Sequence, residues 1–498
     1  MAFYPNNSHS SWSTFQPSRN PAASYNSQPR RSNQRGPSWK QQRAEAKPET
    51  PPLPLGQLLM TINKADLSST TDTSDLPPAI TGCEYVASYS WLDKTSTILV
   101  PGEFRSGASF YSLCLNSYSG KPPAWTPLVK PQQLKEDQGQ YFRDPNAARF
   151  PKHPVEPAVQ ALFKLKPAYP AAEVDVFACG STIGNLLRFA RGIDKSFRFT
   201  LEVIGTTVFF IRREGSPTEI IPDVRGFGHT FPEAYTTWEA DVKGSESHQR
   251  LIKYNFGGVE CLVRFGSDGY FSELDSSSAK VTTPKETSNP TSLADAFSSA
   301  SLGGTTLSKS EILKVKSAGN EIPQSAVFDL KTRSARKAAE NDMSDIYPRL
   351  WVTQVPNLIL AYHKRGLFED IRKLDVHREL DNWAEQNAND IRRLHALMRR
   401  IIEFARNSTG SKLEVYRADI GHLEIRKQAG DGCDALPPDL KTKWEDCFEI
   451  SERKPTDTRG STEESFEECG FFDDSDDDDE EDFTACSLDC GYCGHCTY

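Results

Sequence analysis

An acid and a lysine stand two residues apart in the apolar run Val327-Phe328-Asp329-Leu330-Lys331-Thr332. Such a run predicts a short buried strand. Alternate residues of a strand point to the same face, so Asp329 and Lys331 are expected to share one surface. A carboxylate beside an ammonium can hold a divalent metal ion and activate a water molecule. Because a single Asp-x-Lys also occurs by chance, the elements around it decide what it means.

Further elements flank this strand in a defined order. Residues 259–265 predict a strand that carries Glu260, and residues 349–354 predict an amphipathic helix that bears Gln354. A hydrophobic strand follows at residues 357–362. This order is that of a metal-dependent PD-(D/E)xK nuclease core. The expected fold class is therefore α/β, with a mixed central sheet flanked by helices.

The charge of the chain is unevenly distributed. The net charge is -10 and the mean hydropathy is -0.57, which predicts long solvated stretches. Residues 1–50 carry seven Lys or Arg against two Asp or Glu, whereas residues 451–498 carry sixteen acids against three bases. Without the two tails the net charge is about -2, because the tails contribute +5 and -13 to the total of -10. The acidic balance therefore does not exclude a nucleic-acid partner.

Composition divides the chain into three regions. Residues 1–50 predict a disordered basic tail, which is either a solubilising segment or an arm that contacts RNA. Residues 51–450 predict a single α/β nuclease-like domain with a disordered insertion at 272–320. Residues 451–498 form an acidic tail that ends in a cysteine cluster and could contact protein partners. Segment 103–119 reads either as an ordinary loop or as a retained intron translated in frame.

The N-terminus shows no signal peptide, and no run reaches the roughly eighteen apolar residues that a membrane-spanning helix takes. Seven of the eleven cysteines are scattered singly, which is typical of a reducing compartment. The sequence therefore predicts a nuclear or cytoplasmic protein without a membrane partner.

Local patterns predict the individual elements. Residues 55–62 predict a helix, and residues 85–91 and 97–101 predict strands. Residues 174–214 alternate between strand and helix patterns. Residues 248–265 predict a hairpin with a turn at Gly257-Gly258. Residues 380–406 have apolar residues at helical spacing and predict one long helix.

Residues 170–370 resemble the DXO-type family of decapping exoribonucleases. Asp175–Ser181 is similar to the family's D-[IF]-V-T-W-R-G motif, and Tyr235–Glu239 is similar to its G-Y-K-F-E segment. The strand pair His248–Phe265 resembles the pair that ends in E-V-D and gives Glu260. Asp329–Thr332 matches E-L-K-T, and Gln354 matches the glutamine of the following helix.

The resemblance implies a metal-dependent phosphodiesterase or 5′-cap-processing enzyme that acts on RNA with Mg²⁺ or Mn²⁺. Glu260 and Asp329 would hold the metal ion, and Lys331 would orient the attacking water or stabilise developing charge. Glu239 and Gln354 would position water or substrate.

Two departures from the family pattern bear on activity. Gly180 stands where the family has an arginine, and Leu262 stands where it has the second acid of E-V-D. The sequence offers four substitutes for the missing acid, namely Glu214, Glu219, Asp223 and Asp268. The alternative is a catalytically degenerate RNA- or protein-binding module on the same fold.

The C-terminal cysteines predict a small zinc site. Two overlapping C-x2-C steps can place thiolates around one Zn²⁺, and the candidate ligands are Cys486, Cys490, Cys493 and Cys496. The alternatives are a reactive thiol cluster or an unstructured tail. Asp473, Asp474 and Asp477 form a DDxxD-like pattern of the kind that prenyl-diphosphate synthases use. The pattern lies in a solvated acidic run without a second aspartate-rich helix, so the sequence disfavours that chemistry.

Overall fold

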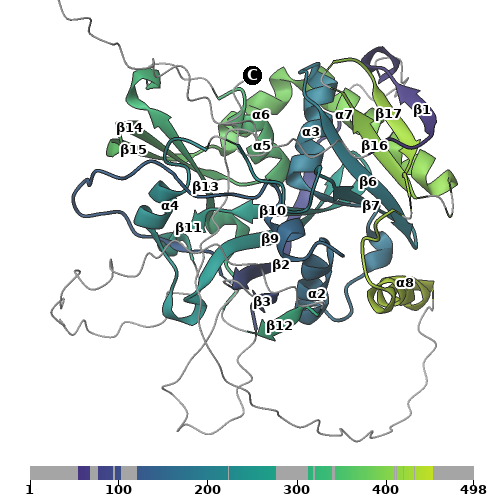
Figure 1. The fold of residues 1–498 in the computed structure, drawn as a ribbon, viewed down its shortest axis with the longest axis horizontal. Coiled ribbons are helices and arrows are strands. Elements are labelled where there is room, and N and C mark those ends of the chain that lie inside the picture. Colours follow the sequence, from purple (N-terminus) through teal and green to yellow (C-terminus); the bar gives the residue numbers. More distant parts are fainter. Residues whose placement is uncertain are drawn as a thin grey trace, which may run out of the picture. The chain divides into compact units, whose positions relative to one another are not determined.

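Two mixed β-sheets form the framework of this computed structural model (Figure 1). The structure describes residues 54–67, 77–92, 96–102, 121–222, 224–275, 312–317, 320–338, 343–408, 410, 412–418, 420–430 and 432–452. All of these lie in one compact unit, Pro51–Tyr498. The predicted tail 1–50, all but the first two residues of the predicted tail 451–498, and segment 103–119 lie outside the described residues, as does most of insertion 272–320. The cysteine cluster lies in this undescribed part of the second tail.

Among the described residues, the larger sheet has eleven strands. In spatial order they are β1 (Leu58–Ile62), β17 (Leu423–Lys427), β16 (Leu413–Arg417), β6 (Phe197–Ile204), β7 (Thr207–Arg212), β5 (Val176–Cys179), β10 (Val259–Ser267), β9 (Ser245–Phe256), β2 (Ile80–Leu92), β3 (Thr97–Val100) and β12 (Lys314–Ser317). At its centre, β5 runs parallel to both β7 and β10. The carboxyl ends of these three strands therefore meet at one edge of the sheet.

The smaller sheet has six strands in the part of the chain that the structure describes. In spatial order they are β15 (Leu367–Asp375), β14 (Asn357–Lys364), β13 (Val327–Ser334), β11 (Gly269–Tyr270), β4 (Ala124–Trp125) and β8 (Thr236–Thr237). The predicted Asp-x-Lys strand is β13, which pairs with β14 and β11 and is therefore internal to this sheet.

Helices cover both faces of the larger sheet. One apolar cluster packs α3 (Gly180–Arg191), α5 (Ile346–Thr353), α6 (His377–Gln386) and α7 (Ala388–Asn407) against one face. A second cluster packs α2 (Glu156–Leu165) and α8 (Pro438–Glu452) against the other. Two further helices, α1 (Pro145–Arg149) and α4 (Thr230–Tyr235), are short. In sequence they are closer to strands of the smaller sheet, and residues of α4 pack in the aromatic cluster on that sheet. The predicted α/β class is confirmed, with a second sheet added.

Several predicted elements are confirmed in detail. Residues 174–214 form β5, α3, β6 and β7 in the predicted alternation. The predicted hairpin is β9 and β10, which pair in antiparallel register from Val259↔Phe256 to Ser267↔His248. Gly257 and Gly258 turn the chain with φ of 58° and 91°, a conformation that side chains other than glycine rarely adopt.

Three predicted elements are wrong. Residues 58–62 form strand β1 instead of a helix, because pairing with β17 outweighs the local preference of Leu58–Ile62. The single helix predicted at 380–406 is two helices, because Asn387 leaves helical geometry with ψ of 21° and its side-chain amide donates to the carbonyl of Trp383. Residues 314–317, placed in a disordered insertion, form strand β12 and pair with β3.

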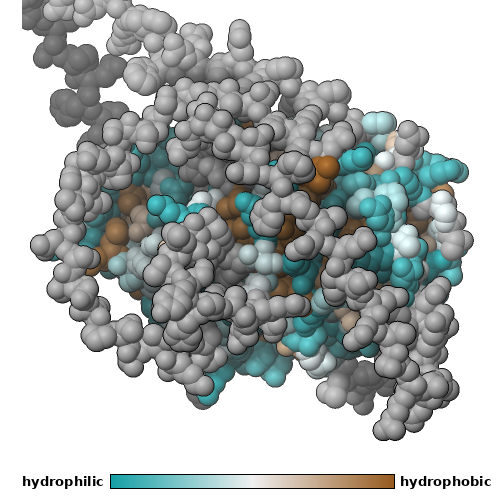
Figure 2. All heavy atoms as spheres, turned by 90° about the horizontal axis from the view of Figure 1, so that it is seen from below, coloured by the Kyte–Doolittle hydropathy of each residue, from teal (hydrophilic) through white to brown (hydrophobic). Residues whose placement is uncertain are grey.

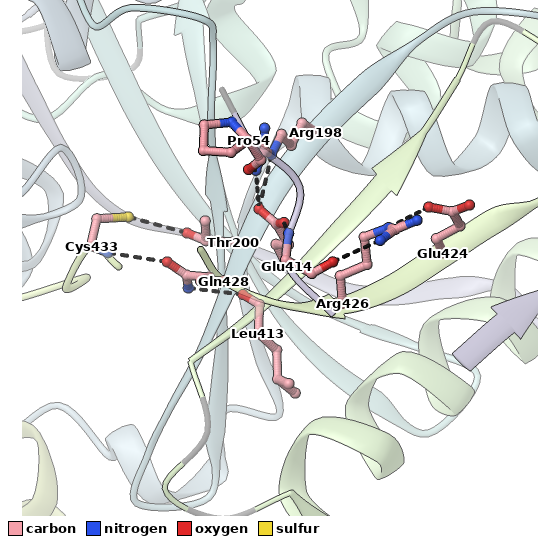
Figure 3. Close-up of polar contacts among 10 residues, drawn as sticks. Pro54, Arg198, Thr200, Leu413, Glu414, Glu424, Arg426, Gln428 and Cys433 are labelled. Atoms are coloured by element: carbon pink, nitrogen blue, oxygen red, sulfur yellow. Dashed lines mark hydrogen bonds and ion pairs between the residues drawn. The ribbon is translucent and has the colours of Figure 1, made fainter. Parts of the chain in front are cut away.

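A buried ion pair fastens the first described residues to the sheet (Figure 3). Glu414 on β16 has a fully buried side chain, and its carboxylate accepts hydrogen bonds from Arg198 on β6 at 2.9 and 2.6 Å. Arg198 also donates to the carbonyl of Pro54, and Arg426 donates to that of Gly56. These bonds fix the chain just before β1 enters the sheet.

The surface shown in Figure 2 carries hydrophobic patches interleaved with hydrophilic ones. Among the residues that the structure describes, no helix is long and apolar enough to cross a membrane.

We predict that Trp444→Ala lowers the free energy of unfolding by about 3–5 kcal/mol. Trp444 on α8 is fully buried, packs edge-on to Phe163 and Phe209, and donates its indole N–H to Thr207 Oγ1 at 3.0 Å. Urea unfolding followed by circular dichroism measures the change. Glu445→Ala, at the next and exposed position, is the control and is expected to change stability by less than about 0.5 kcal/mol. Equal effects of both substitutions would contradict this packing.

Candidate functional site

The chain crosses from one sheet to the other at Asp268. Strand β10 ends at Ser267 in the larger sheet, and β11 begins at Gly269 in the smaller one. The Asp268 carboxylate accepts a hydrogen bond from the backbone N–H of Leu330 on β13 at 2.7 Å. Gly269 has no room for a side chain, because a Cβ would lie 2.4 Å from the Phe328 ring. The sequence Asp268-Gly269 therefore suits a tight passage between the sheets.

Asp329 and Lys331 share one face of β13, as the sequence predicts. The intervening Leu330 and the preceding Phe328 face the other way, into the aromatic cluster of the smaller sheet. Asp329 and Lys331 are buried, with exposed fractions of 8% and 4%. Arg349 on α5 forms an ion pair with the Asp329 carboxylate, and each of the two side chains is 10% exposed. The acid of the Asp-x-Lys pair is therefore neutralised by a cation of the chain itself.

Glu239 is also paired with a cation. It follows β8, forms an ion pair with Lys121, and accepts a hydrogen bond from the hydroxyl of Tyr270 on β11. Tyr270 lies two residues after Asp268, at the passage between the sheets. Asp329 and Lys331 therefore lie on β13, Asp268 directly precedes its neighbour β11, and Glu239 follows β8 and is linked to β11 through Tyr270.

The structure does not bring Glu260 to Asp329. Glu260 lies at the start of β10, eight residues before Asp268, which corresponds to roughly 26 Å along a strand. Its carboxylate accepts a hydrogen bond from Asn255 at 2.7 Å and lies 3.8 Å from the ammonium of Lys253. These contacts join the two strands of the hairpin.

Gln354 lies just beyond the end of α5, apart from Arg349. It adopts left-handed backbone geometry with φ of 49° and ends the helix. Its side chain donates to the carbonyl of Trp351, and its own carbonyl accepts a hydrogen bond from Gln324 at 3.0 Å. Gln354 lines a separate cavity together with residues of α6 such as His377 and Leu380. Its observed contacts are those of a helix cap.

A cavity of about 110 Å³ opens at the carboxyl ends of β5, β7 and β10. Its wall includes Cys179 and Ser181 at the start of α3, and also Asp268 and Arg349. We call this cavity the arginine cleft because four of its lining residues are arginines, namely Arg143, Arg212, Arg264 and Arg349. The carboxyl edge of parallel strands and the N-terminus of a helix are common positions for anionic ligands.

Acids and carbonyl groups orient these arginines. Arg143 pairs with Glu219 at 2.8 Å, and Arg212 pairs with Glu214 at 2.5 Å. Arg264 donates to the carbonyl of Pro154 at 2.8 Å. Burial alone would lower the pKa of Arg264, but electrostatic interactions with Tyr89, Asp144 and Cys179 raise it overall, so its guanidinium stays charged.

His248 contributes a neutral group to the cleft wall. Its Nδ1 lies 3.0 Å from the Ser90 hydroxyl, and the residue is only 2% exposed. Burial, and secondarily the charge of Arg250, hold the pKa of His248 well below its usual value of 6.5. The imidazole is therefore uncharged at neutral pH.

The residues around Asp329 do not fit a tightly bound Mg²⁺ or Mn²⁺. Such an ion takes about six oxygen ligands, several of them from ionised carboxylates. Here Asp329 and Glu239 are each paired with a cation, and Asp268 accepts a backbone N–H. Within the described part of the chain, no three His, Cys, Asp or Glu side chains gather as a metal site.

The sequence identified Asp268 only as one of four substitutes and did not indicate Arg349 and Lys121, the cations that pair with Asp329 and Glu239. Arg349 was visible five residues before Gln354 in the predicted helix, but its partner Asp329 lies on a different element. Lys121 directly follows segment 103–120 and has no local pattern that points to Glu239. These pairs depend on the packing of distant elements.

The chain matches one known family over most of its length. The model of one family, described as Domain of unknown function (DUF8563), matches residues 56–443. No curated protein sequence matches the chain.

Three solved structures are similar over most of this chain and nearly all of their own. Rai1 of Scheffersomyces stipitis, in complex with (3′-NADP)+ and calcium, has 11% identity, a TM-score of 0.47 and coverage of 79% of this chain and 99% of its own. Rai1 of Candida albicans, in complex with pU5-Mn2+, has 9% identity, a TM-score of 0.44 and coverage of 80% of this chain and 99% of its own. Dxo1 of K. lactis, in complex with manganese, has 10% identity, a TM-score of 0.42 and coverage of 75% of this chain and 99% of its own. The similarity to DXO-type proteins that the sequence motifs predicted is thus found again among solved structures.

We predict that His248 makes the protein less stable in mild acid. Its folded-state pKa is depressed, so the unfolded chain binds the extra proton, and the stability contribution is lost as the pH falls through 6.5. Between pH 7.5 and pH 5.5, the free energy of unfolding should fall by about 1.4 kcal/mol more in the wild type than in His248→Gln. Urea titrations at both pH values measure the difference. Identical pH dependence of the two proteins would contradict a neutral, buried His248.

Proposed function

The chain belongs to the family described as Domain of unknown function (DUF8563), and we propose that it is a nuclease-like protein that binds RNA through the arginine cleft. The observation that carries the proposal is the convergence of four arginines with the N-terminus of α3 at one carboxyl edge of the sheet. A phosphate group of the RNA backbone or of its 5′ end is the proposed ligand.

The donors in the cleft support an anionic ligand even though the arginines have acidic partners. A guanidinium has five N–H donors, and pairing with one carboxylate uses at most two of them. The first backbone N–H groups of α3 lack partners within the helix, and the helix dipole favours negative charge there. Recognition would therefore come from directed hydrogen bonds more than from net charge.

RNA is proposed as the ligand because residues 170–370 carry the motifs that resemble DXO-type decapping exoribonucleases. Among these motifs, Asp329 and Lys331 do share one buried face. The cleft also lies beside this pair, because Arg349 lines the cleft and contacts Asp329.

Binding without hydrolysis fits the charges better than metal-dependent cleavage. A phosphodiesterase or cap-processing enzyme that uses Mg²⁺ or Mn²⁺ leaves carboxylates available to the ion. In this chain, Arg349 neutralises Asp329 and Lys121 neutralises Glu239. The catalytic alternative is favoured by Asp268, which lies next to Asp329 and has no ion pair among the described residues.

We predict that Arg143→Gln with Arg212→Gln weakens the binding of a short 5′-phosphorylated RNA by roughly tenfold to a hundredfold. Both side chains line the cleft and are partly exposed, so they can reach a phosphate. Fluorescence anisotropy measures the dissociation constants at fixed ionic strength. Arg378→Gln, an exposed arginine on α6 outside the cleft wall, is the matched control and is expected to change affinity by less than about twofold.

The same RNA separates binding from cleavage. Affinity should be unchanged by EDTA, and the RNA should remain intact after incubation with the wild-type protein and Mn²⁺. Equal affinity of the double variant and the wild type would refute the cleft as the binding site. Shortened products that depend on Mn²⁺ and disappear in Asp329→Asn would establish the catalytic alternative instead.

A further inference from the structure

We infer that Arg349 occupies the position of a divalent cation beside Asp329 and Asp268, so that the site is a latent metal site closed by the chain's own guanidinium. This inference goes beyond RNA binding, because it concerns what the acids of the site can hold. It rests on the contacts of three residues from three different elements, β13, the β10–β11 passage and α5.

The two acids lie next to each other. The Asp268 carboxylate accepts the N–H of Leu330, the residue that directly follows Asp329 on β13. Arg349 pairs with Asp329, and both Arg349 and Asp268 line the arginine cleft. The guanidinium therefore stands at the boundary between the acid pair and the open cavity, which is where an ion held by both carboxylates would be reached from solvent.

The fold holds Arg349 in this position. On α5, the neighbouring Leu350 and Trp351 are buried in the core, with exposed fractions of 0% and 6%. The hydroxyl of Thr353 donates to the carbonyl of Arg349 at 3.0 Å, one helical turn away. Because the helix is anchored on the side of its apolar residues, its arginine faces β13 as part of the packed structure.

A single positive charge replaces a double one in this arrangement. A guanidinium satisfies carboxylate oxygens through N–H donors in a fixed plane, whereas a divalent cation would draw in further oxygen ligands and water. With Arg349 in place, an ion that approached Asp329 would meet a like charge within the ion pair. Removal of that charge leaves Asp329 without its cation beside Asp268, which lines the cleft.

The test is the binding of Mn²⁺ to Arg349→Gln in the full chain. Electron paramagnetic resonance measures free Mn²⁺, and thermal unfolding measures its effect on the folded protein. We expect Arg349→Gln to bind one additional Mn²⁺ at least tenfold more tightly than the wild type does at this site. Its melting temperature should rise with Mn²⁺, whereas that of the wild type should not change.

Two control variants make the result specific. Arg143→Gln removes the same charge from the same cleft, but its partner is Glu219, so it should gain no Mn²⁺. Asp329→Asn combined with Arg349→Gln removes the acid as well and should lose the gained ion. The sixteen acids of residues 451–498 contribute the same background to all variants.

Three outcomes would overturn the inference. The first is a rise in the melting temperature of the wild type with Mn²⁺. This measurement uses the wild-type protein alone and does not depend on whether a variant folds. The second is a folded Arg349→Gln that binds no additional ion, and the third is an equal gain in Arg143→Gln. None of these results depends on RNA, so the RNA-binding proposal stands or falls separately by the anisotropy measurements.

Discussion

The hydrogen bond from the Leu330 N–H to the Asp268 carboxylate is the interaction on which the site depends. One continuous stretch of chain belongs to the larger sheet up to Ser267 and to the smaller sheet from Gly269 onward. The bond fixes where these sheets meet, and thereby places the arginine cleft of the first beside the acid and lysine of the second. A side chain at Gly269 would collide with Phe328, so the passage has little freedom to shift.

Local charge neutrality is the second theme of this region. Burial of an unpaired carboxylate or guanidinium is costly, and each buried charge here has a partner of opposite sign or a polar contact. Arg349 forms an ion pair with Asp329, and Lys121 forms one with Glu239. The consequence is a site that is complete without an added ion. Arginines line its open side together with Asp268, and Asp329 is buried and paired with Arg349.

The local elements of this fold were largely predictable, whereas the contacts of the site were not. Period-two patterns and a glycine pair identified the β9–β10 hairpin, and the placement of Asp329 with Lys331 follows from strand geometry alone. Glu260 was chosen from the correct strand but lies near its start, whereas Asp268 lies just past its end. A sequence motif identifies the strand but does not show which end of that strand lies at the site. The Arg349–Asp329 pair depends on how α5 packs on β13, which no local pattern encodes.

The pairing of β1 with β17 joins residues 58–62 to residues 423–427 across almost the whole described chain. A sheet whose outer strand is nearly the first described segment, and whose neighbour is nearly the last, cannot be completed until β17 has been synthesised. Leu58 and Leu59 are more than 40% exposed even when paired, so the nascent strand presents apolar side chains throughout that delay. The order of synthesis thus leaves β1 open to association with other chains until β17 is available to pair with it.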